Sequence, residues 1–197
     1  MDSLSSSTPL WLEYLKLLAG IATPLVAAWF GYYISKAVKR LEASALMNQK
    51  IIERRLKVFD DMSPLLNDLY CYFRRIGHWR ELSPPALISA KRTLDKTFYI
   101  NRALFSVEFE AKYFSFIMDD CFKPYVGEHK NAQLRMDPKV HKEDEAHQWD
   151  PAWDALFVQT SDDVCSLKKI EMDYETLMQQ FAIELAISRP RPVLDRR

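Results

Sequence analysis

The first pattern in the chain is a run of apolar residues close to its start. No charged residue occurs between Leu17 and Ile34, and apart from Thr23 the run shows no polar stripe. A helix of a soluble protein would carry such a stripe. At about 1.5 Å per residue, a helix of this length crosses most of a hydrocarbon core of about 30 Å. The pattern predicts a transmembrane helix over 9–36, preceded by a disordered segment over 1–8.

The flanks of this run carry the residue types that favour a membrane interface. Aromatic rings lie at both ends of the run, and basic residues outnumber acidic ones after it. Amphipathic rings prefer the headgroup level, and an excess of Lys and Arg marks the cytoplasmic side. We therefore expect a single pass through a membrane, with the N-terminus outside and the body in the cytoplasm. The alternative is a helix buried in a soluble core, which Pro24 favours, although membrane helices tolerate proline. The predicted interface residues are Trp11, Tyr14, Trp29, Tyr32, Tyr33, Lys36, Lys39 and Arg40.

A second pattern, with apolar residues spaced alternately four and three apart, continues the helix beyond the apolar run. It extends from Ile34 through Val38 to Ile52. Such a seam is typical of a parallel coiled coil, in which a polar core residue such as Asn48 fixes the register. The same pattern also suits packing against other helices of the same chain. Small residues spaced four apart let two membrane helices approach closely. We predict a juxtamembrane helix or coiled coil over 37–63. The candidates for self-association are Ala27, Gly31, Ser35 and Asn48.

The rest of the chain alternates helical patterns with helix-breaking signals. Pro64 is expected to interrupt the long helix, and Ser83 and Ser106 are suited to cap the starts of later helices. No stretch alternates polar and apolar residues between tight turns, so no β-sheet is expected. The predicted fold class is all-α. The transmembrane helix continues into a cytoplasmic bundle of four or five helices over 64–188, and a disordered tail follows over 189–197. The bundle helices are expected over 65–77, 83–99, 106–122 and 161–188.

Composition removes several classes of function. Lys and Arg together number 27, as do Asp and Glu, so the formal net charge is zero. Nonspecific electrostatic binding of nucleic acid by the whole protein is not expected from such a balance. The sequence holds 4 glycines, and they are scattered. Because a phosphate-binding loop needs several glycines close together, neither a P-loop nor a dinucleotide-binding motif can form.

Cysteine and histidine residues give no pattern for nucleophilic catalysis or metal binding. The cysteines are far apart and form no Cys-x-x-Cys pair, so reduced structural thiols are expected. His141 and His147 lie six apart in the polar segment 127–153, together with His129. Two metal ligands on one helix face need a spacing of three or four. We therefore expect a solvated loop there, no metal and no cofactor. The cysteines are Cys71, Cys121 and Cys165.

Basic residues interleaved with aromatic rings form one candidate ligand site in the body. Such a surface can hold an anionic lipid headgroup, RNA or a small anionic ligand. The alternative is a solvated helix face with the rings buried behind it. The candidate residues for an anionic ligand are Arg74, Arg75, Arg80, Lys91, Arg92 and Lys96.

Three stretches of the sequence resemble an uncharacterised bacterial family of single-pass, membrane-anchored helical proteins. They are Asn48–Met62, Leu66–Phe73 and Lys91–Phe98, and the resemblance covers about residues 10–125. It implies an N-terminal membrane helix and a helical cytoplasmic body. No activity and no catalytic residues come with it.

These observations favour a non-enzymatic function. We expect a membrane-anchored helical interaction or effector module at the cytoplasmic face of the inner membrane, with a role in bacterial defence as one form of it. The expected partners are the lipid bilayer, a second copy of the chain and a protein of unknown identity. The alternative is a ligand-sensing or nucleic-acid-binding helical body tethered to the membrane, with nucleic acid the less favoured ligand.

Overall fold

The computed structural model describes residues 10–124 and 132–186, and it divides the chain into two compact units. The first unit is Met1–Lys50 and the second is Ile51–Arg197. The predicted disordered segments over 1–8 and 189–197 lie outside the described residues, as does His129. Most described residues are helical, so the all-α prediction is confirmed in its coarse form. Within the first helix, the side chains at 10, 12–13, 15–19 and 21–23 also lie outside the description.

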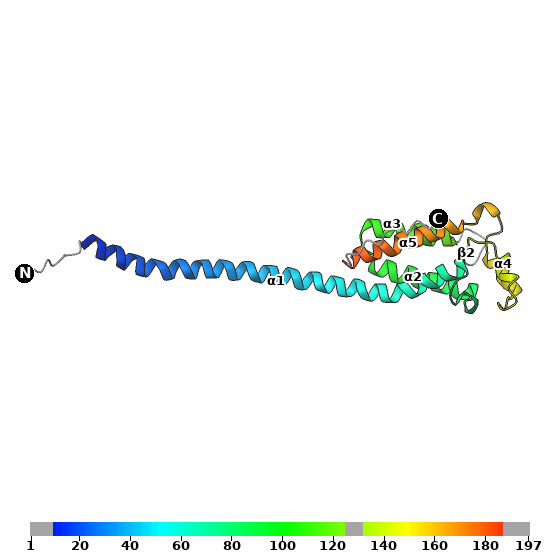
Figure 1. The fold of residues 1–197 in the computed structure, drawn as a ribbon, viewed down its shortest axis with the longest axis horizontal. Helices are drawn as coiled ribbons and strands as arrows, with labels where there is room; N and C mark the ends of the chain where they lie inside the picture. Colours follow the sequence, from blue (N-terminus) through cyan, green and yellow to red (C-terminus); the bar gives the residue numbers. More distant parts are fainter. Residues whose placement is uncertain (1–9, 125–131, 187–197) are drawn as a thin grey trace, which may run out of the picture. The chain divides into compact units, whose positions relative to one another are not determined.

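Helix α1 (Leu10–Arg74) is one uninterrupted helix of 65 residues (Figure 1). Its part within the first unit exposes every described side chain from Pro24 to Lys50. In the described part of the chain, no helix combines the length and the apolar character needed to cross a membrane. The predicted span over 9–36 includes side chains outside the described residues, and it stays a prediction.

The predicted break at Pro64 is wrong, because α1 continues through it. A proline inside a helix removes one backbone hydrogen bond and costs about 3 kcal/mol. On either side of it, Met62, Leu66 and Leu69 have no exposed surface. Burying each such side chain contributes about 1.5–3 kcal/mol, so packing of the two flanking turns outweighs the cost of the proline.

Helix α1 ends in a Schellman motif. The backbone N–H of Ile76 donates to the carbonyl of Cys71 (3.1 Å), and that of Arg75 donates to the carbonyl of Tyr72 (3.3 Å). Arg75 has a φ of 55° and Gly77 a φ of 61°. This left-handed backbone is the usual way of satisfying the last carbonyl groups of a helix. The predicted end near Gly77 is therefore close to the observed one.

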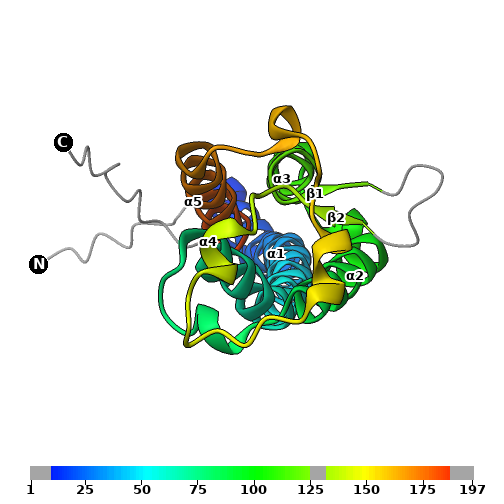
Figure 2. The ribbon, with the colours of Figure 1, turned by 90° about the vertical axis from the view of Figure 1, so that its right-hand side faces the viewer.

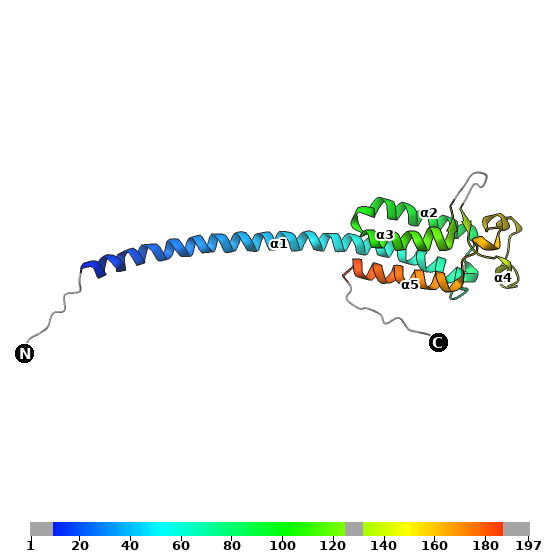
Figure 3. The ribbon, with the colours of Figure 1, turned by 90° about the horizontal axis from the view of Figure 1, so that it is seen from above.

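In the described part of the second unit, the longer helices pack side by side as a bundle. Figures 2 and 3 show α2, α3 and α5 beside the C-terminal part of α1. The predicted start of the last helix at Ser161 is wrong: a short 3-10 helix lies there, and α5 begins after its cap, Ser166. The further α-helices are α2 (Pro84–Asn101), α3 (Val107–Phe114), α4 (Lys139–Lys142) and α5 (Leu167–Glu184). A π-helix occupies Ser115–Cys121, and 3-10 helices occupy Trp79–Glu81, Arg102–Leu104, Pro151–Leu156 and Ser161–Asp163.

The expectation of no β-structure is corrected by a small antiparallel ladder. Strands β1 (Phe122–Lys123) and β2 (Gln133–Leu134) pair Phe122 with Leu134, and Leu134 also forms a parallel bridge with Phe157. Strands of two residues are too short to show an alternating sequence pattern. They are held instead by the burial of Phe122, Leu134 and Phe157, none of which has exposed surface.

Aromatic rings fill the core of the bundle. Phe181 of α5 contacts Phe109 of α3 and Phe59 of α1, with ring centroids 4.4 and 5.2 Å apart. Tyr70 and Tyr174 stack at 4.1 Å with 8° between their planes. Such pairs contribute about 0.5–1.5 kcal/mol beyond the area that they bury. These ring contacts therefore stabilise the packing of α1, α3 and α5 against one another.

Candidate functional site

The predicted membrane-interface residues that the structure describes are all exposed. Trp29 packs on Tyr33 with ring centroids 4.7 Å apart, and the Lys36 ammonium lies 6.0 Å from the centroid of the Tyr32 ring. Trp11 is 61% exposed. In the described part of the first unit, α1 is the only element. These rings are therefore presented outward along a single helix.

The candidates for self-association are exposed as well. Ala27, Gly31 and Ser35 follow one another at four-residue spacing, which places them on one face of the helix. A Cβ atom added to Gly31 would meet nothing within 4 Å. Asn48 is also exposed, further along the same helix. In the described part of the first unit, this face is therefore exposed.

The six basic residues predicted to hold an anion do not assemble into one site. Arg74 pairs with Glu171 of α5 (3.2 Å), and Arg80 pairs with Asp144 in the loop after α4 (2.7 Å). The other four are divided as follows: Lys91 is buried and paired with Asp95, Arg75 is exposed at the end of α1, and Arg92 and Lys96 are exposed on α2. The six residues are near one another in the sequence, but they belong to different elements, and helix periodicity turns those on α2 to different faces.

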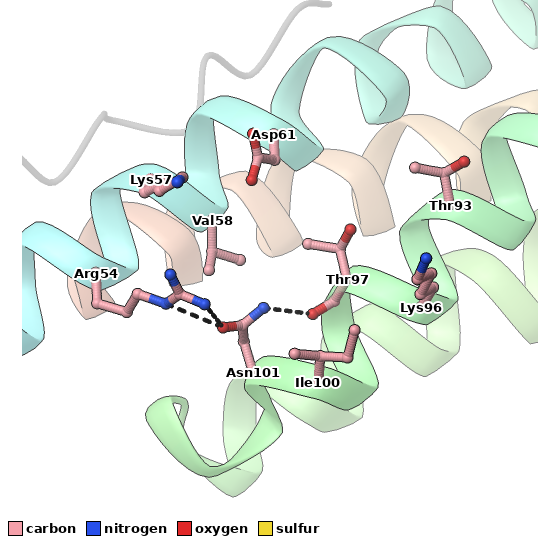
Figure 4. A pocket seen from close by; sticks show the side chains of 9 residues that line it. All are labelled: Arg54, Lys57, Val58, Asp61, Thr93, Lys96, Thr97, Ile100 and Asn101. Carbon is pink, nitrogen blue, oxygen red and sulfur yellow. Dashed lines mark hydrogen bonds between the residues drawn. The ribbon is translucent and has the colours of Figure 1, made fainter.

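The structure places Lys96 instead in a groove with basic residues from α1. We call this cavity of about 340 Å³ the α1–α2 groove (Figure 4). Its walls are two helix stripes with spacings of three and four, so each stripe occupies one helix face. The side chains from α1 and α2 meet across it in antiparallel order. The groove is lined by Arg54, Lys57, Val58 and Asp61 of α1 and by Thr93, Lys96, Thr97, Ile100 and Asn101 of α2.

One hydrogen-bond chain fixes the geometry of the groove. Nε and Nη2 of Arg54 both donate to Oδ1 of Asn101, at 3.3 and 3.1 Å. Nδ2 of Asn101 donates to the main-chain oxygen of Thr97 at 2.8 Å. Asn101 is 8% exposed, so its amide is fixed by burial as well as by these bonds. The guanidinium of Arg54 is thereby oriented by a neutral group, which leaves its positive charge in place.

The electrostatic character of the groove is positive. Arg54, Lys57 and Lys96 contribute three cationic groups, and Asp61 contributes one carboxylate. Two of the five guanidinium N–H donors are used by the bonds to Asn101. The arrangement can bind an anion through charge-assisted hydrogen bonds. It holds no nucleophile beyond ordinary hydroxyl groups.

The histidines of the predicted solvated loop are buried, which corrects that expectation. His141 is 1% exposed and His147 is 5% exposed. Nε2 of His141 lies 3.1 Å from the carbonyl of Tyr72, and Nδ1 of His147 lies 3.0 Å from the carbonyl of Arg80. Burial lowers the pKa of His141 to about 4. Among the described residues, no three metal-ligating side chains gather. His141 is therefore neutral at neutral pH, and both rings pack against Trp79 in the interior.

A second polar cluster has no signal in the sequence. The ammonium of Lys169 contacts the carboxylates of both Asp120 and Asp173, and the hydroxyl of Ser115 donates to Asp173 at 2.9 Å. Asp120 lies on the π-helix with no exposed surface, and burial raises the pKa of its carboxyl to about 6. One lysine shared by two carboxylates favours a proton on the more buried of them. Sequence reasoning missed this cluster because 49 residues separate Asp120 from Lys169.

The three cysteines are free thiols. Cys71 and Cys121 are buried, and Cys165 is half-buried. Burial, assisted by the charge of Asp120, raises the pKa of the Cys165 thiol to about 11. A thiol that stays protonated is a poor nucleophile. Cys165 is therefore not expected to act as a nucleophile at neutral pH, and the structural role of the three thiols stays a prediction.

Comparisons with known proteins add no identity. No protein-family model, curated protein or solved structure matches the chain. Function is therefore inferred from the residues and contacts of the chain itself.

Proposed function

We propose that this chain is a non-enzymatic module tethered to the bacterial inner membrane by the N-terminal part of α1. The exposure of apolar side chains there is the observation that carries the proposal. Leu25 is 67% exposed and Ile34 is 61% exposed, and Val26, Trp29 and Phe30 between them are exposed as well. Contiguous apolar surface of this kind marks a site of contact with another apolar phase or molecule. Lipid covers every side of such a helix at once.

The charge on the flank sets the direction of the tether. Lys36, Lys39 and Arg40 follow the apolar run and are exposed. Basic residues next to a membrane helix favour the cytoplasmic side, where anionic lipids also attract them. The helical body would then act in the cytoplasm, beside the inner leaflet.

Interaction, rather than catalysis, suits the rest of the molecule. Asp120 and His141, whose pKa values are strongly shifted, are packed in the interior and do not line the α1–α2 groove. The open face at Ala27, Gly31 and Ser35 suits a second copy of the chain. Single-anchor helical proteins also serve as membrane-disrupting effectors in bacterial defence, and this subtype is proposed by analogy alone.

The tether is tested by extraction of membranes from cells that express the full chain. The wild-type chain should stay in the membrane pellet after treatment with alkaline carbonate. Val26→Arg together with Phe30→Arg places two charges in the apolar run and should release most of the chain, because a charge at the centre of a membrane helix costs about 2.5–3.5 kcal/mol.

A matched control adds the same charges outside the run. Ala43→Arg together with Met47→Arg changes two exposed residues further along α1 and should leave the chain in the pellet. Recovery of the wild-type chain in the aqueous fraction would overturn the tether. The effector subtype needs a separate measurement: induction should depolarise the membrane and stop growth, and an unchanged membrane potential would remove it.

A further inference from the structure

The α1–α2 groove combines a fixed guanidinium, two ammonium groups and hydroxyl groups around one cavity. From this combination we infer that the groove binds the phosphate ester of a small, hydroxyl-bearing molecule. The inference goes beyond the proposed tether and does not depend on it, because every lining residue belongs to the second unit.

Arg54, unlike its neighbour Arg55, has a neutral hydrogen-bond partner. Its neighbour Arg55 is neutralised by the carboxylate of Glu184 at 3.1 Å. Arg54 bonds instead to the amide oxygen of Asn101. A guanidinium that is fixed by a neutral acceptor keeps its full charge and its planar set of donors, and it loses little side-chain entropy when a ligand arrives. That is the pre-organised form in which Arg recognises phosphate oxygens.

Lys57 and Lys96 add two further positive charges to the groove. Lys57 lies one turn after Arg54 on α1, and Lys96 lies on the opposite wall (Figure 4). Two ammonium groups and a guanidinium around one cavity match the charge of a phosphomonoester, which carries close to two negative charges at neutral pH. A carboxylate ligand would carry half that charge and would leave the site less well neutralised.

The remaining lining residues indicate what the phosphate is attached to. Thr93 and Thr97 line the wall opposite Asp61, and Val58 and Ile100 add apolar surface. Asp61 repels a phosphate, so the phosphate is expected towards Arg54, with ligand hydroxyl groups towards Asp61 as donors. A cavity of about 340 Å³ admits a small polyol phosphate.

The same chemistry is present in two sources. A free metabolite such as glycerol 3-phosphate carries a phosphomonoester beside hydroxyl groups, and the headgroup of a lysophosphatidic acid carries a phosphomonoester beside one free hydroxyl group. Calorimetric titration of the full chain in neutral-detergent micelles separates them. One arm uses glycerol 3-phosphate. The other uses 1-hexanoyl lysophosphatidic acid, with 1-hexanoyl lysophosphatidylcholine as its blank. Saturable binding in either polyol-phosphate arm supports the inference and names the source.

Variants then show whether the groove is the site. Lys57→Gln together with Lys96→Gln should weaken binding about tenfold or more, since each removes a charge-assisted contact. Both side chains are exposed, so the fold should be retained, as far-UV circular dichroism would confirm. Arg54→Lys keeps the charge but loses the planar fork, and it should also weaken binding about tenfold.

The control removes the same charge elsewhere. Lys112→Gln together with Lys168→Gln changes two exposed lysines on α3 and α5 and should leave the affinity within about twofold of wild type. Three results would overturn the inference: no saturable binding in either arm, an equal loss in the control, or full affinity in the groove variants. Release of the chain from membranes would leave all these titrations unchanged, so the two proposals fail separately.

Discussion

Arg55 of α1 and Glu184 of α5 lie 129 residues apart in the sequence and form an ion pair. Nη2 of Arg55 lies 3.1 Å from Oε2 of Glu184, whose side chain is 5% exposed. Arg55 also donates to the main-chain oxygens of Leu104 (2.6 Å) and Glu184 (2.7 Å), and the N–H of Ser106 donates to the Glu184 carboxylate (3.0 Å). One guanidinium therefore ties α1 to the start of α3 and to the end of α5.

We predict that Glu184→Gln lowers the free energy of unfolding by about 2 kcal/mol. The amide keeps the shape of the side chain but leaves the partly buried Arg55 without a counter-charge, and removing one partner of such a pair is costly. Urea unfolding of both proteins, followed by circular dichroism, measures the difference. Glu175→Gln on the same helix is exposed and should change the value by less than about 0.5 kcal/mol. Equal effects of the two substitutions would contradict the role of the pair.

The starts of α2 and α3 could be predicted from the sequence because their determinants are local. Ser83 accepts from the N–H of Ala86 (3.4 Å) and Ser106 from that of Phe109 (3.2 Å), and each pair is three residues apart. The continuation of α1 through Pro64 could not be predicted in that way. The cost of the proline is local, whereas the compensating burial of Leu66 comes from partners distant in the sequence.

The α1–α2 groove shows the same division. From the sequence, the residues of each wall can be assigned to one face of a helix. Which two faces lie opposite each other cannot be derived in that way. Arg54 and Asn101 are 47 residues apart, and only the reversal of the chain between α1 and α2 brings them together. The sequence identifies Lys96 as a candidate but places it with Arg74, because nothing local shows which face of each helix lies opposite the other.

Near the end of α5, an Ala→Gly substitution should raise or lower the free energy of unfolding according to where it is made. Ala186 follows the helix with a φ of 56°, a left-handed conformation that costs a residue with a Cβ about 1 kcal/mol. Ala186→Gly should therefore raise the free energy of unfolding by about 0.5–1 kcal/mol. Ala182→Gly, one turn earlier and inside the helix, should lower it by about 1 kcal/mol. The midpoint temperatures of thermal unfolding of the two variants should therefore shift in opposite directions from that of wild type. A loss of stability in both variants would contradict the backbone argument.

Asp120 should make the protein more stable in mild acid. Burial raises its pKa from 3.8 to about 6 in the folded state, so the folded state binds the proton more tightly than the unfolded one. The contribution is present below pH 3.8 and is lost as the pH rises through 6, which amounts to about 1 kcal/mol between pH 5 and 7.5. Asp120→Asn should remove this dependence in urea titrations at the two pH values. Asp119→Asn, an exposed neighbour, should retain it.

His141 should act in the opposite sense over an overlapping range. Burial lowers its pKa from 6.5 to about 4, with smaller contributions from His147 and Arg75, so the unfolded state binds the proton more tightly. Its contribution to stability is present above pH 6.5 and is lost as the pH falls towards 4, by about 2 kcal/mol between pH 7 and 4.5.

The substitution His141→Phe isolates this contribution. Phe fills the ring site beside Tyr72 and cannot take up a proton, so the variant should lose less stability than wild type between pH 7 and 4.5, even if it is less stable at pH 7. Val140→Ala is the control, because Val140 is an exposed, non-titrating neighbour on α4 and its replacement should keep the wild-type loss. If both variants lost stability in parallel with wild type, the acid sensitivity would have to arise elsewhere. If the dependence vanished in His141→Phe but grew in Asp120→Asn, the two buried groups would be shown to offset each other in the native protein.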